Sequence, residues 1–278
     1  MAQDGWRIEQ RMNDKVFDMQ KYPECTTLRL VIEQGIATLW LARPESRNAL
    51  NVAMCSELVQ MMEALARDDG VRVIVVRGEG VAFCAGADLK ERQGMSPAEM
   101  VARRVSGFTA YAAIEAMAKP VIAAVHGPAF GSGCEIIASC DFVLASSAAV
   151  FKYPEVGWGT VGATQRLPRI VGPRMAKELL FTGRAVDAQE ALQLGLVNHV
   201  YGDDELEARV MEMAAQIAAA NPLTVGLTKR SIDNGLETSR AGAMAVELLA
   251  IQENLRHSDW KKAIAGFGHK ESPNATAR

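Results

Sequence analysis

The sequence predicts an α/β fold, and three observations carry this prediction. Residues 71–76 and 121–125 are short, β-branched and apolar, as buried strands are. Between them a helix begins at residues 96–99 (SPAE), where serine is the cap, proline takes the first helical position and glutamate follows three residues after the cap. Strands that alternate with helices are typical of α/β architecture.

The remaining elements follow in chain order. Alternating apolar residues predict a hairpin of two strands at residues 27–32 and 35–42. Asn51 stands where a helix cap is needed, and the apolar residues at helical spacing after it predict an amphipathic helix. They are Met54, Leu58, Met61, Met62 and Leu65.

From Thr164 to Gly268 the pattern predicts one helix after another, including a helix that opens with a cap at Asp187. The apolar stripes of this region need cover from the α/β part, from each other or from a neighbouring subunit, so self-association is expected. We expect a polar extension at residues 1–25, an α/β core at 26–200, a helical oligomerisation region at 201–270 and a flexible tail at 271–278.

Composition narrows the classes of function. The chain has 278 residues, with 30 Lys and Arg against 33 Asp and Glu, so it offers no broad basic surface for nucleic acid. It contains no run of eighteen apolar residues, so no membrane span is expected. Five cysteines without a C-x-x-C pair indicate thiols in a reducing compartment, and the acidic first twenty residues do not resemble a targeting signal, which favours the cytoplasm.

Two familiar motifs are weak in this chain. Residues 157–162 (GWGTVG) match the G-x-G-x-x-G dinucleotide fingerprint, but a proline at 154 precedes them and helices follow, so a glycine-rich pocket wall is the stronger interpretation. Ser132 does not lie in a G-x-S-x-G elbow, which favours a small turn residue over a nucleophile. The four histidines lack metal-ligand spacing, so no metal site is expected.

Two glycine-rich segments follow the buried strands. Residues 78–90 (GEGVAFCAGADLK) and 126–135 (HGPAFGSGCE) are rich in small residues, so their backbone can approach a ligand closely. The second segment opens a short helix predicted over residues 134–139. Such an arrangement can supply two converging N–H donors for a developing oxyanion.

Two carboxylates stand on apolar sequence near these segments. Glu135 lies in the first turn of the short helix, and Glu155 lies among the apolar residues of 153–158. Each could be an ordinary exposed glutamate, but together they offer the acid and the base that one substrate needs. We expect Trp158 and its neighbours to raise the pKa of Glu155 by desolvation, and the helix dipole to keep the pKa of Glu135 lower.

Several segments carry a resemblance to a known family. They are residues 41–51 (LARPESRNALN), 83–91 (FCAGADLKE), 132–135 (SGCE), Glu155 and 164–169 (TQRLPR). With them the sequence resembles the crotonase, or enoyl-CoA hydratase/isomerase, superfamily over residues 26–270. One segment departs from the family pattern, because residues 157–163 (GWGTVGA) stand where family hydratases usually have Pro-Gly and a glycine run.

The resemblance implies a fold and a site. The fold is a spiral of ββα repeats with a helical C-terminal trimerisation region, assembled as a homotrimer or as a homohexamer, a dimer of trimers. Catalysis is implied for Glu135 and Glu155, with the Ala87 and Ser132 N–H groups as oxyanion donors. The residues implied in binding an acyl-CoA are Ala85, Asp88, Leu89, Lys90, Trp158, Phe267 and Lys270. Of these, Lys90 is a candidate for the CoA phosphates, and Phe267 and Lys270 match a pair that contacts the CoA adenosine.

The expected activity is that of a 2-enoyl-CoA hydratase, a lyase of fatty acid metabolism. It needs no cofactor, since coenzyme A is part of the substrate. Trp158 leaves open another isomerase, hydratase-lyase or hydrolase of the superfamily that acts on a bulkier acyl group. A non-catalytic acyl-CoA-binding protein and an NAD-dependent oxidoreductase are the alternatives outside this chemistry.

Overall fold

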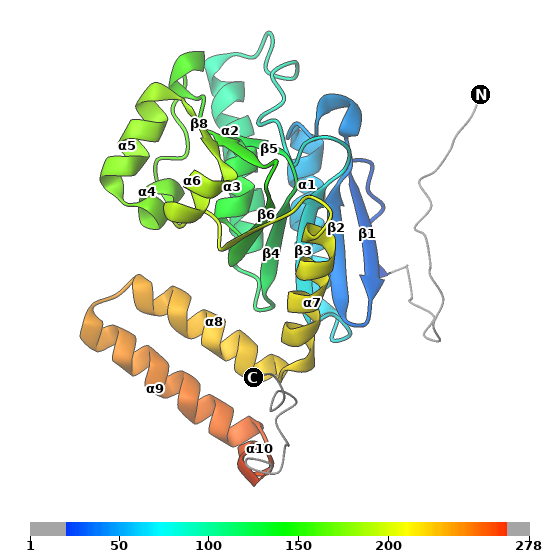
Figure 1. The fold of residues 1–278 in the computed structure, drawn as a ribbon, viewed down its shortest axis with the longest axis vertical. Helices are drawn as coiled ribbons and strands as arrows, with labels where there is room; N and C mark the ends of the chain where they lie inside the picture. The colour runs from blue at the N-terminus through cyan, green and yellow to red at the C-terminus, as the bar shows by residue number, and fades with distance from the viewer. Residues whose placement is uncertain (1–20, 266–278) are drawn as a thin grey trace, which may run out of the picture. The chain divides into compact units, whose positions relative to one another are not determined.

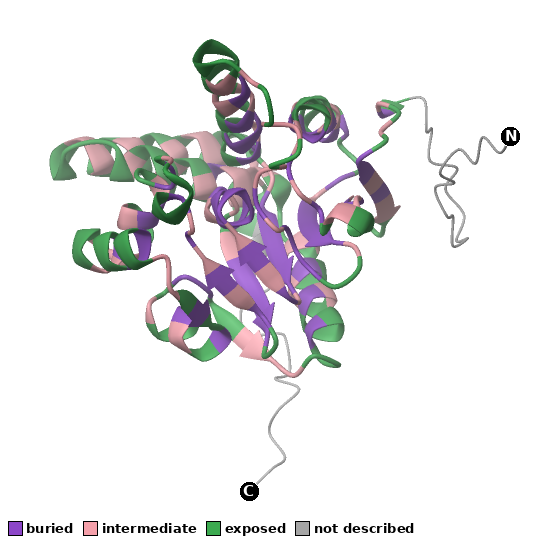
Figure 2. Cartoon of the chain, turned by 90° about the horizontal axis from the view of Figure 1, so that it is seen from above, coloured by how far each residue is buried: buried purple, intermediate pink, exposed green. Residues whose placement is uncertain are grey.

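The central strands are continuous apolar runs because both of their faces are buried. The structure is a computed structural model that describes residues 21–265. Within it, β3 (Val73–Gly78) and β4 (Val121–Val125) have no exposed residue. Runs of this kind are typical of parallel strands that are covered on both sides. Figure 2 shows these central strands as mostly buried, with exposed residues on the helices.

The strands form two sheets. The larger sheet has the order β1-β2-β3-β4-β6-β9, and all its neighbours are parallel except β1 and β2, which form the predicted antiparallel hairpin. The smaller sheet has the order β5-β7-β8. The other strands are β1 (Leu28–Glu33), β2 (Ile36–Leu41), β5 (Pro128–Phe130), β6 (Phe142–Ser146), β7 (Val150–Lys152), β8 (Ala185–Asp187) and β9 (His199–Tyr201).

Helices cover both faces of the larger sheet (Figure 1). On one face, α1 (Val52–Arg67) and α2 (Pro97–Glu115) pack together over the main core. On the other face, α7 (Leu206–Ala219) buries Leu206, Val210 and Ala214 against β3, β4 and β6. The edge strand β9 completes the sheet beside β6.

The predicted helix starts are confirmed by their caps. The Asn51 side chain accepts a hydrogen bond from Met54 N, which begins α1. Ser96 and Glu99 form a reciprocal capping box at the start of α2, so two backbone N–H groups gain partners there. The remaining helices of this part are α3 (Ser132–Ala138), α4 (Arg166–Val171), α5 (Pro173–Thr182) and α6 (Ala188–Gln193), with the short 3-10 helices η2 (Pro44–Ser46) and η3 (Val156–Trp158).

The prediction of helices alone after Thr164 was wrong in two places. β8 pairs with β7, and β9 pairs with β6, so two short strands interrupt the helical region. Each strand has only three residues. A segment of this length carries no period of its own, and pairing with a distant strand determines its conformation.

The chain divides into two compact units, one ending at Ala219 and the other beginning at Ala220. The second unit is a pair of helices, α8 (Pro222–Leu236) and α9 (Arg240–His257), followed by α10 (Trp260–Ala265). Leu227 is its only buried apolar residue among those described, and many apolar side chains of α8 and α9 remain exposed. None of the described helices is long and apolar enough to cross a membrane.

Candidate active site

The first glycine-rich loop follows β3 and turns sharply back on itself. A Cβ atom on Gly78 would lie 2.5 Å from the carbonyl oxygens of Ala82 and Phe83, so only glycine fits where the turn begins. Asn48, which is fully buried, holds the loop from the other side. Its amide nitrogen donates to Glu79 O and Ala82 O, each at 2.8 Å.

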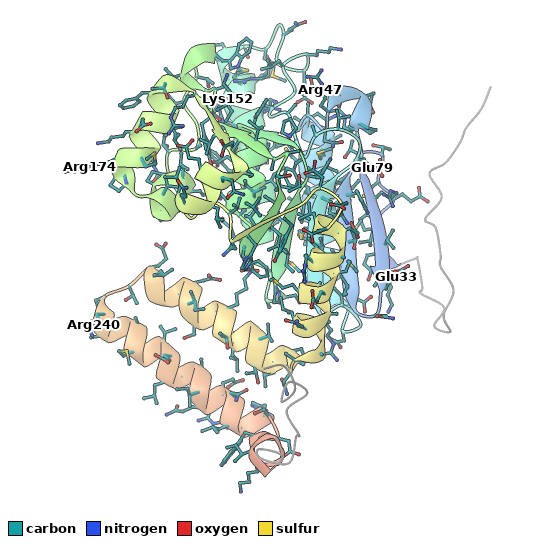
Figure 3. The ribbon with its side chains drawn as sticks, viewed as in Figure 1. Glu33, Arg47, Glu79, Lys152, Arg174 and Arg240 are labelled. Carbon is teal, nitrogen blue, oxygen red and sulfur yellow. The ribbon has the colours of Figure 1, made fainter. Side chains whose placement is uncertain are left out.

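The two glycine-rich loops are joined by backbone hydrogen bonds. Phe130 N donates to Cys84 O at 2.9 Å, and a Cβ atom on Gly133 would lie 2.5 Å from that same carbonyl oxygen. Arg47 and Lys152, both labelled in Figure 3, each supply a carbonyl oxygen that anchors one loop. The N–H donors are Ala85 for the first loop and Gly131 for the second, each at 2.9 Å. The two loops therefore lie against each other, and the convergence of their N–H donors stays a prediction.

The backbone N–H groups of Ala87 and Ser132 have no hydrogen-bond acceptor in the described part of the chain. Gly86 O and Asp88 N both bond to Leu50, so the N–H between them points to the opposite side. Ser132 is the first residue of α3, where a helix offers no partner for the N–H group. Among the described residues, no hydrogen bond uses either N–H as a donor.

Glu135 is buried in the first turn of α3, with 6% of its surface exposed. Its Oε2 atom accepts a hydrogen bond from Arg166 Nη1 at 3.1 Å. Arg166 is held in turn by both oxygens of Glu115, at 2.6 and 2.8 Å, and lies over the ring of Tyr111. The chain thus places a cation beside Glu135 and fixes its orientation through a second carboxylate.

Burial affects Glu135 as well as Glu155, so the expectation that Glu135 has the lower pKa of the two stays a prediction. Burial raises the pKa of Glu135 above the usual value, and the Arg166 charge only partly opposes this, while the charge of Glu155 adds to the increase. The sequence argument considered the dipole of α3 and did not include desolvation.

Glu155 lies after β7 and is also buried, with 7% of its surface exposed. Within the described chain its Oε2 atom is buried without a hydrogen-bond partner. Burial raises its pKa, and Arg104 and Arg92 partly oppose this effect. Two glycines make room for the carboxyl group, because a Cβ atom on Gly131 would lie 3.1 Å from Oε1. A Cβ atom on Gly162 would lie 2.9 Å from Cγ.

The predicted direction for Glu155 and its predicted cause, burial, are confirmed, but the expected contribution of Trp158 and Val156 was wrong. Trp158 is 66% exposed in this chain, and Val156 is exposed as well, so neither residue excludes water from the carboxyl group. Tyr153 is buried, and the close backbone of the two glycines covers the group instead. Residues 157–162 overlap the end of η3 and form part of the wall over Glu155. They do not lie between a strand and the start of a helix, as a dinucleotide-binding motif would.

The other predicted binding residues fall into three groups. Lys90, Leu89 and Trp158 are exposed, and Ala85 is half-buried. Asp88 accepts hydrogen bonds from Lys90 N and pairs with Arg43 at 3.0 Å, so its carboxylate stabilises the loop. Phe267 and Lys270 lie outside the described residues. Within residues 21–265, no cluster of histidine, cysteine, aspartate or glutamate could hold a metal ion.

Asn48 and Arg166 lie within the segments that carry the family resemblance, but no role was predicted for either residue. Asn48 orients the first loop, and Arg166 contacts Glu135. The sequence around Arg166 gave only a weak indication of a role in the site, because this cation stands near the apolar residues Leu167 and Ala163. Its partners Glu115 and Glu135 lie 51 and 31 residues away, beyond the reach of any local pattern.

Known proteins match the chain over most of its length. The family model for enoyl-CoA hydratase/isomerase matches residues 31–278. The "Probable enoyl-CoA hydratase 2, mitochondrial" of Arabidopsis thaliana is 40% identical over 246 residues, 87% of this chain and 81% of that protein. The crotonyl-CoA hydratase of Syntrophomonas wolfei is 39% identical over 246 residues, 87% of this chain and 95% of that protein.

A solved structure agrees with these relatives. The enoyl-CoA hydratase from Bacillus anthracis superposes with a TM-score of 0.86 at 33% identity, over 89% of this chain and 98% of that one. This match confirms the predicted crotonase-like fold. By its fold and by its relatives, the chain belongs to the enoyl-CoA hydratase/isomerase family.

Proposed function

We propose that this protein is a lyase that adds water reversibly across the 2,3 double bond of a 2-enoyl-CoA thioester. The observation that carries the proposal is a pair of buried glutamates with different neighbours next to two open N–H groups. Glu135 has a cationic hydrogen-bond partner, and Glu155 has an oxygen without one. A buried acid and a buried base on either side of one substrate are what hydration requires.

The chemistry follows from these positions. The Ala87 and Ser132 N–H groups donate to the thioester oxygen, which becomes negative as the enolate forms. Glu135 takes a proton from water, whose oxygen bonds to C3. Glu155 gives its proton to C2, so one water molecule is added in total. Exchange with solvent then returns both carboxyl groups to their starting states.

Hydration of a short 2-enoyl-CoA, measured by the loss of the conjugated thioester absorbance, tests the proposal. We expect the variants Glu135→Gln and Glu155→Gln each to lose about 10²- to 10⁴-fold in kcat, as a positioned acid or base contributes. Glu63→Gln is the matched control, because this glutamate lies on α1 with its side chain 59% exposed. Full activity in both active-site variants would refute the assignment. Product analysis separates hydration from a shift of the double bond.

The remaining parts of the proposal concern the substrate handle, assembly and location. We propose that the coenzyme A portion is bound in part by Lys90, Phe267 and Lys270, with no further cofactor. A homotrimer or homohexamer is proposed for the assembly, and the cytoplasm and fatty acid metabolism for the setting. Some relatives are named as mitochondrial proteins, so the compartment of this protein should be determined by direct localisation in cells.

The support for assembly is the apolar surface of the second unit. An open groove of about 540 Å³ lies between α8 and α9. The exposed apolar side chains on these helices are Ile232, Leu236, Met244, Leu248, Leu249, Ile251 and Leu255. A contiguous apolar surface of this kind is typical of an interface between subunits. Sedimentation at micromolar concentration tests this, and a monomer would contradict it.

A further inference from the structure

Two arginines beside Glu155 form no salt bridge among the described residues. Arg104 lies on α2, and its Nη2 atom donates only to Thr160 Oγ1, at 3.2 Å, among the described residues. The side chain of Arg92, in the loop before α2, makes no hydrogen bond or ion pair within that same part of the chain. The neighbouring Arg103, in contrast, pairs with Glu91 at 3.0 Å. Arg92 and Arg104 are therefore half-buried cations that form no ion pair among the described residues, and the opposite charge that interacts with them is that of Glu155 when it is ionised.

Arg104 and the Glu155 carboxyl group flank the same glycine. The position that a Cβ atom would take on Gly162 lies 3.1 Å from Arg104 Nη1 and 3.3 Å from Glu155 Oε1. Arg92 is near enough for its charge to interact with those of Arg103, Arg104 and Glu155. The two cations thus lie next to the group that would protonate C2 of the substrate.

The charges of Arg92 and Arg104 oppose the protonated form of Glu155 that the reaction needs, and burial outweighs this effect. A nearby positive charge stabilises the ionised form of a carboxyl group, whereas a general acid must hold its proton near neutral pH. The like charges of Arg92 and Arg104 also repel each other. A bound anion at the arginines would remove both penalties, and it would raise the pKa of Glu155 when substrate is present.

We propose that the acyl group of the natural substrate ends in a carboxylate, which Arg104 and Arg92 bind. The inference rests on the proposed hydratase function, because it names the class of acyl group for the same site. Arginine suits this role, since its planar guanidinium can donate two parallel hydrogen bonds to one carboxylate. Because Arg104 lies beside the acid that serves C2, the carboxylate belongs on a short chain, a few bonds beyond the double bond.

Two substrates of equal carbon number test the proposal. They are 4-carboxybut-2-enoyl-CoA and pent-2-enoyl-CoA, which differ in the terminal group. We expect the wild-type protein to have a kcat/KM at least about tenfold higher for the carboxylated ester, since a hydrogen bond to a charged group contributes about that factor or more. In Arg104→Met and Arg92→Met the ratio of the two kcat/KM values should fall by about 10- to 100-fold, mainly through the KM of the carboxylated ester.

An exposed arginine serves as the control, and each result that would contradict the inference differs from the result expected. Arg67→Met should keep the wild-type ratio, because that side chain is 78% exposed on α1. Equal hydration of both esters by the wild type would overturn the inference and leave the hydratase function standing. An unchanged ratio in both arginine variants would overturn it as well. If neither ester is hydrated, the proposed function fails and the inference fails with it. The wild-type comparison needs no variant, so it decides the question even if Arg104→Met does not fold.

Discussion

Replacement of Arg166 by methionine tests how the site separates its base from its acid. Methionine keeps much of the apolar stem and removes the charge that contacts Glu135 Oε2 at 3.1 Å. The Arg166 and Glu135 side chains are only 19% and 8% exposed, so solvent screens their interaction weakly. A hydrogen bond to a charged group contributes about 1.5–3 kcal/mol. At about 1.4 kcal/mol per unit, its loss should raise the pKa of Glu135 by about one to two units.

The pH dependence of kcat/KM measures this shift. If Glu135 must be ionised to accept a proton from water, activity falls as the pH drops through its pKa. The acidic limb should therefore move about one to two units towards higher pH in Arg166→Met, and activity well below the limb should fall by about 10- to 100-fold. Arg166→Lys keeps the charge but not the paired contacts with Glu115. Its acidic limb should therefore lie between those of the wild type and Arg166→Met.

Two further measurements make this result decisive. Arg67→Met, on the exposed surface of α1, should leave both limbs in place. The circular dichroism spectrum and thermal midpoint should establish that Arg166→Met is folded. An acidic limb that stays at its wild-type pH in a folded, active Arg166→Met protein would refute the assignment of Glu135 as the base that Arg166 assists.

Three other substitutions have defined outcomes. Asn48→Ala should lower the free energy of unfolding by about 3 kcal/mol in chemical denaturation, because three backbone groups, whose hydrogen bonds are buried or partly buried, lose their partner; a loss below about 1 kcal/mol would contradict its role in the loop. Gly162→Ala should displace Glu155 and Arg104, whose atoms lie 2.9 and 3.1 Å from the added Cβ, and lower kcat at least about tenfold while the fold is retained; wild-type kcat would show that the wall can yield. Trp158→Ala should leave the alkaline limb of kcat/KM in place, since a side chain that is 66% exposed does not desolvate Glu155; a limb moved to lower pH would restore the sequence-based expectation.

The sequence predicted those parts of the fold that local patterns determine. Asn51 and Ser96 cap their helices as expected, because a side chain that bonds to the backbone three residues later leaves a local signal. β8 and β9 were missed because three residues carry no period, and their pairing partners are distant in sequence. A helix or strand with a periodic pattern in its own sequence can thus be predicted. A short strand that forms only because it pairs with a distant strand cannot.

The same distinction applies to the site. Glu135 and Glu155 could be selected as a pair because each follows a strand end and lies on apolar sequence. Their electrostatic environment could not, because it depends on Arg166 and Arg104, which reach the glutamates from other helices. The dipole of α3 was visible in the sequence, whereas the burial of Glu135 was not. The dipole favours the ionised form of Glu135, and its burial acts in the opposite direction.

Burial raises the pKa of both glutamates, so burial alone does not decide which one is the acid. Their charges also interact, so the protons belong to the pair, and ionisation of one raises the pKa of the other. The Arg166 hydrogen bond favours ionisation at Glu135, whereas a backbone hydrogen bond and the charges of Arg104 and Arg92 favour it at Glu155, whose Oε2 atom has no donor in the described chain. The proposed reaction requires the singly protonated pair to carry its proton on Glu155. Once Glu135 is ionised, its negative charge helps Glu155 to retain that proton, so the base and the acid of the proposed reaction stabilise each other's working state.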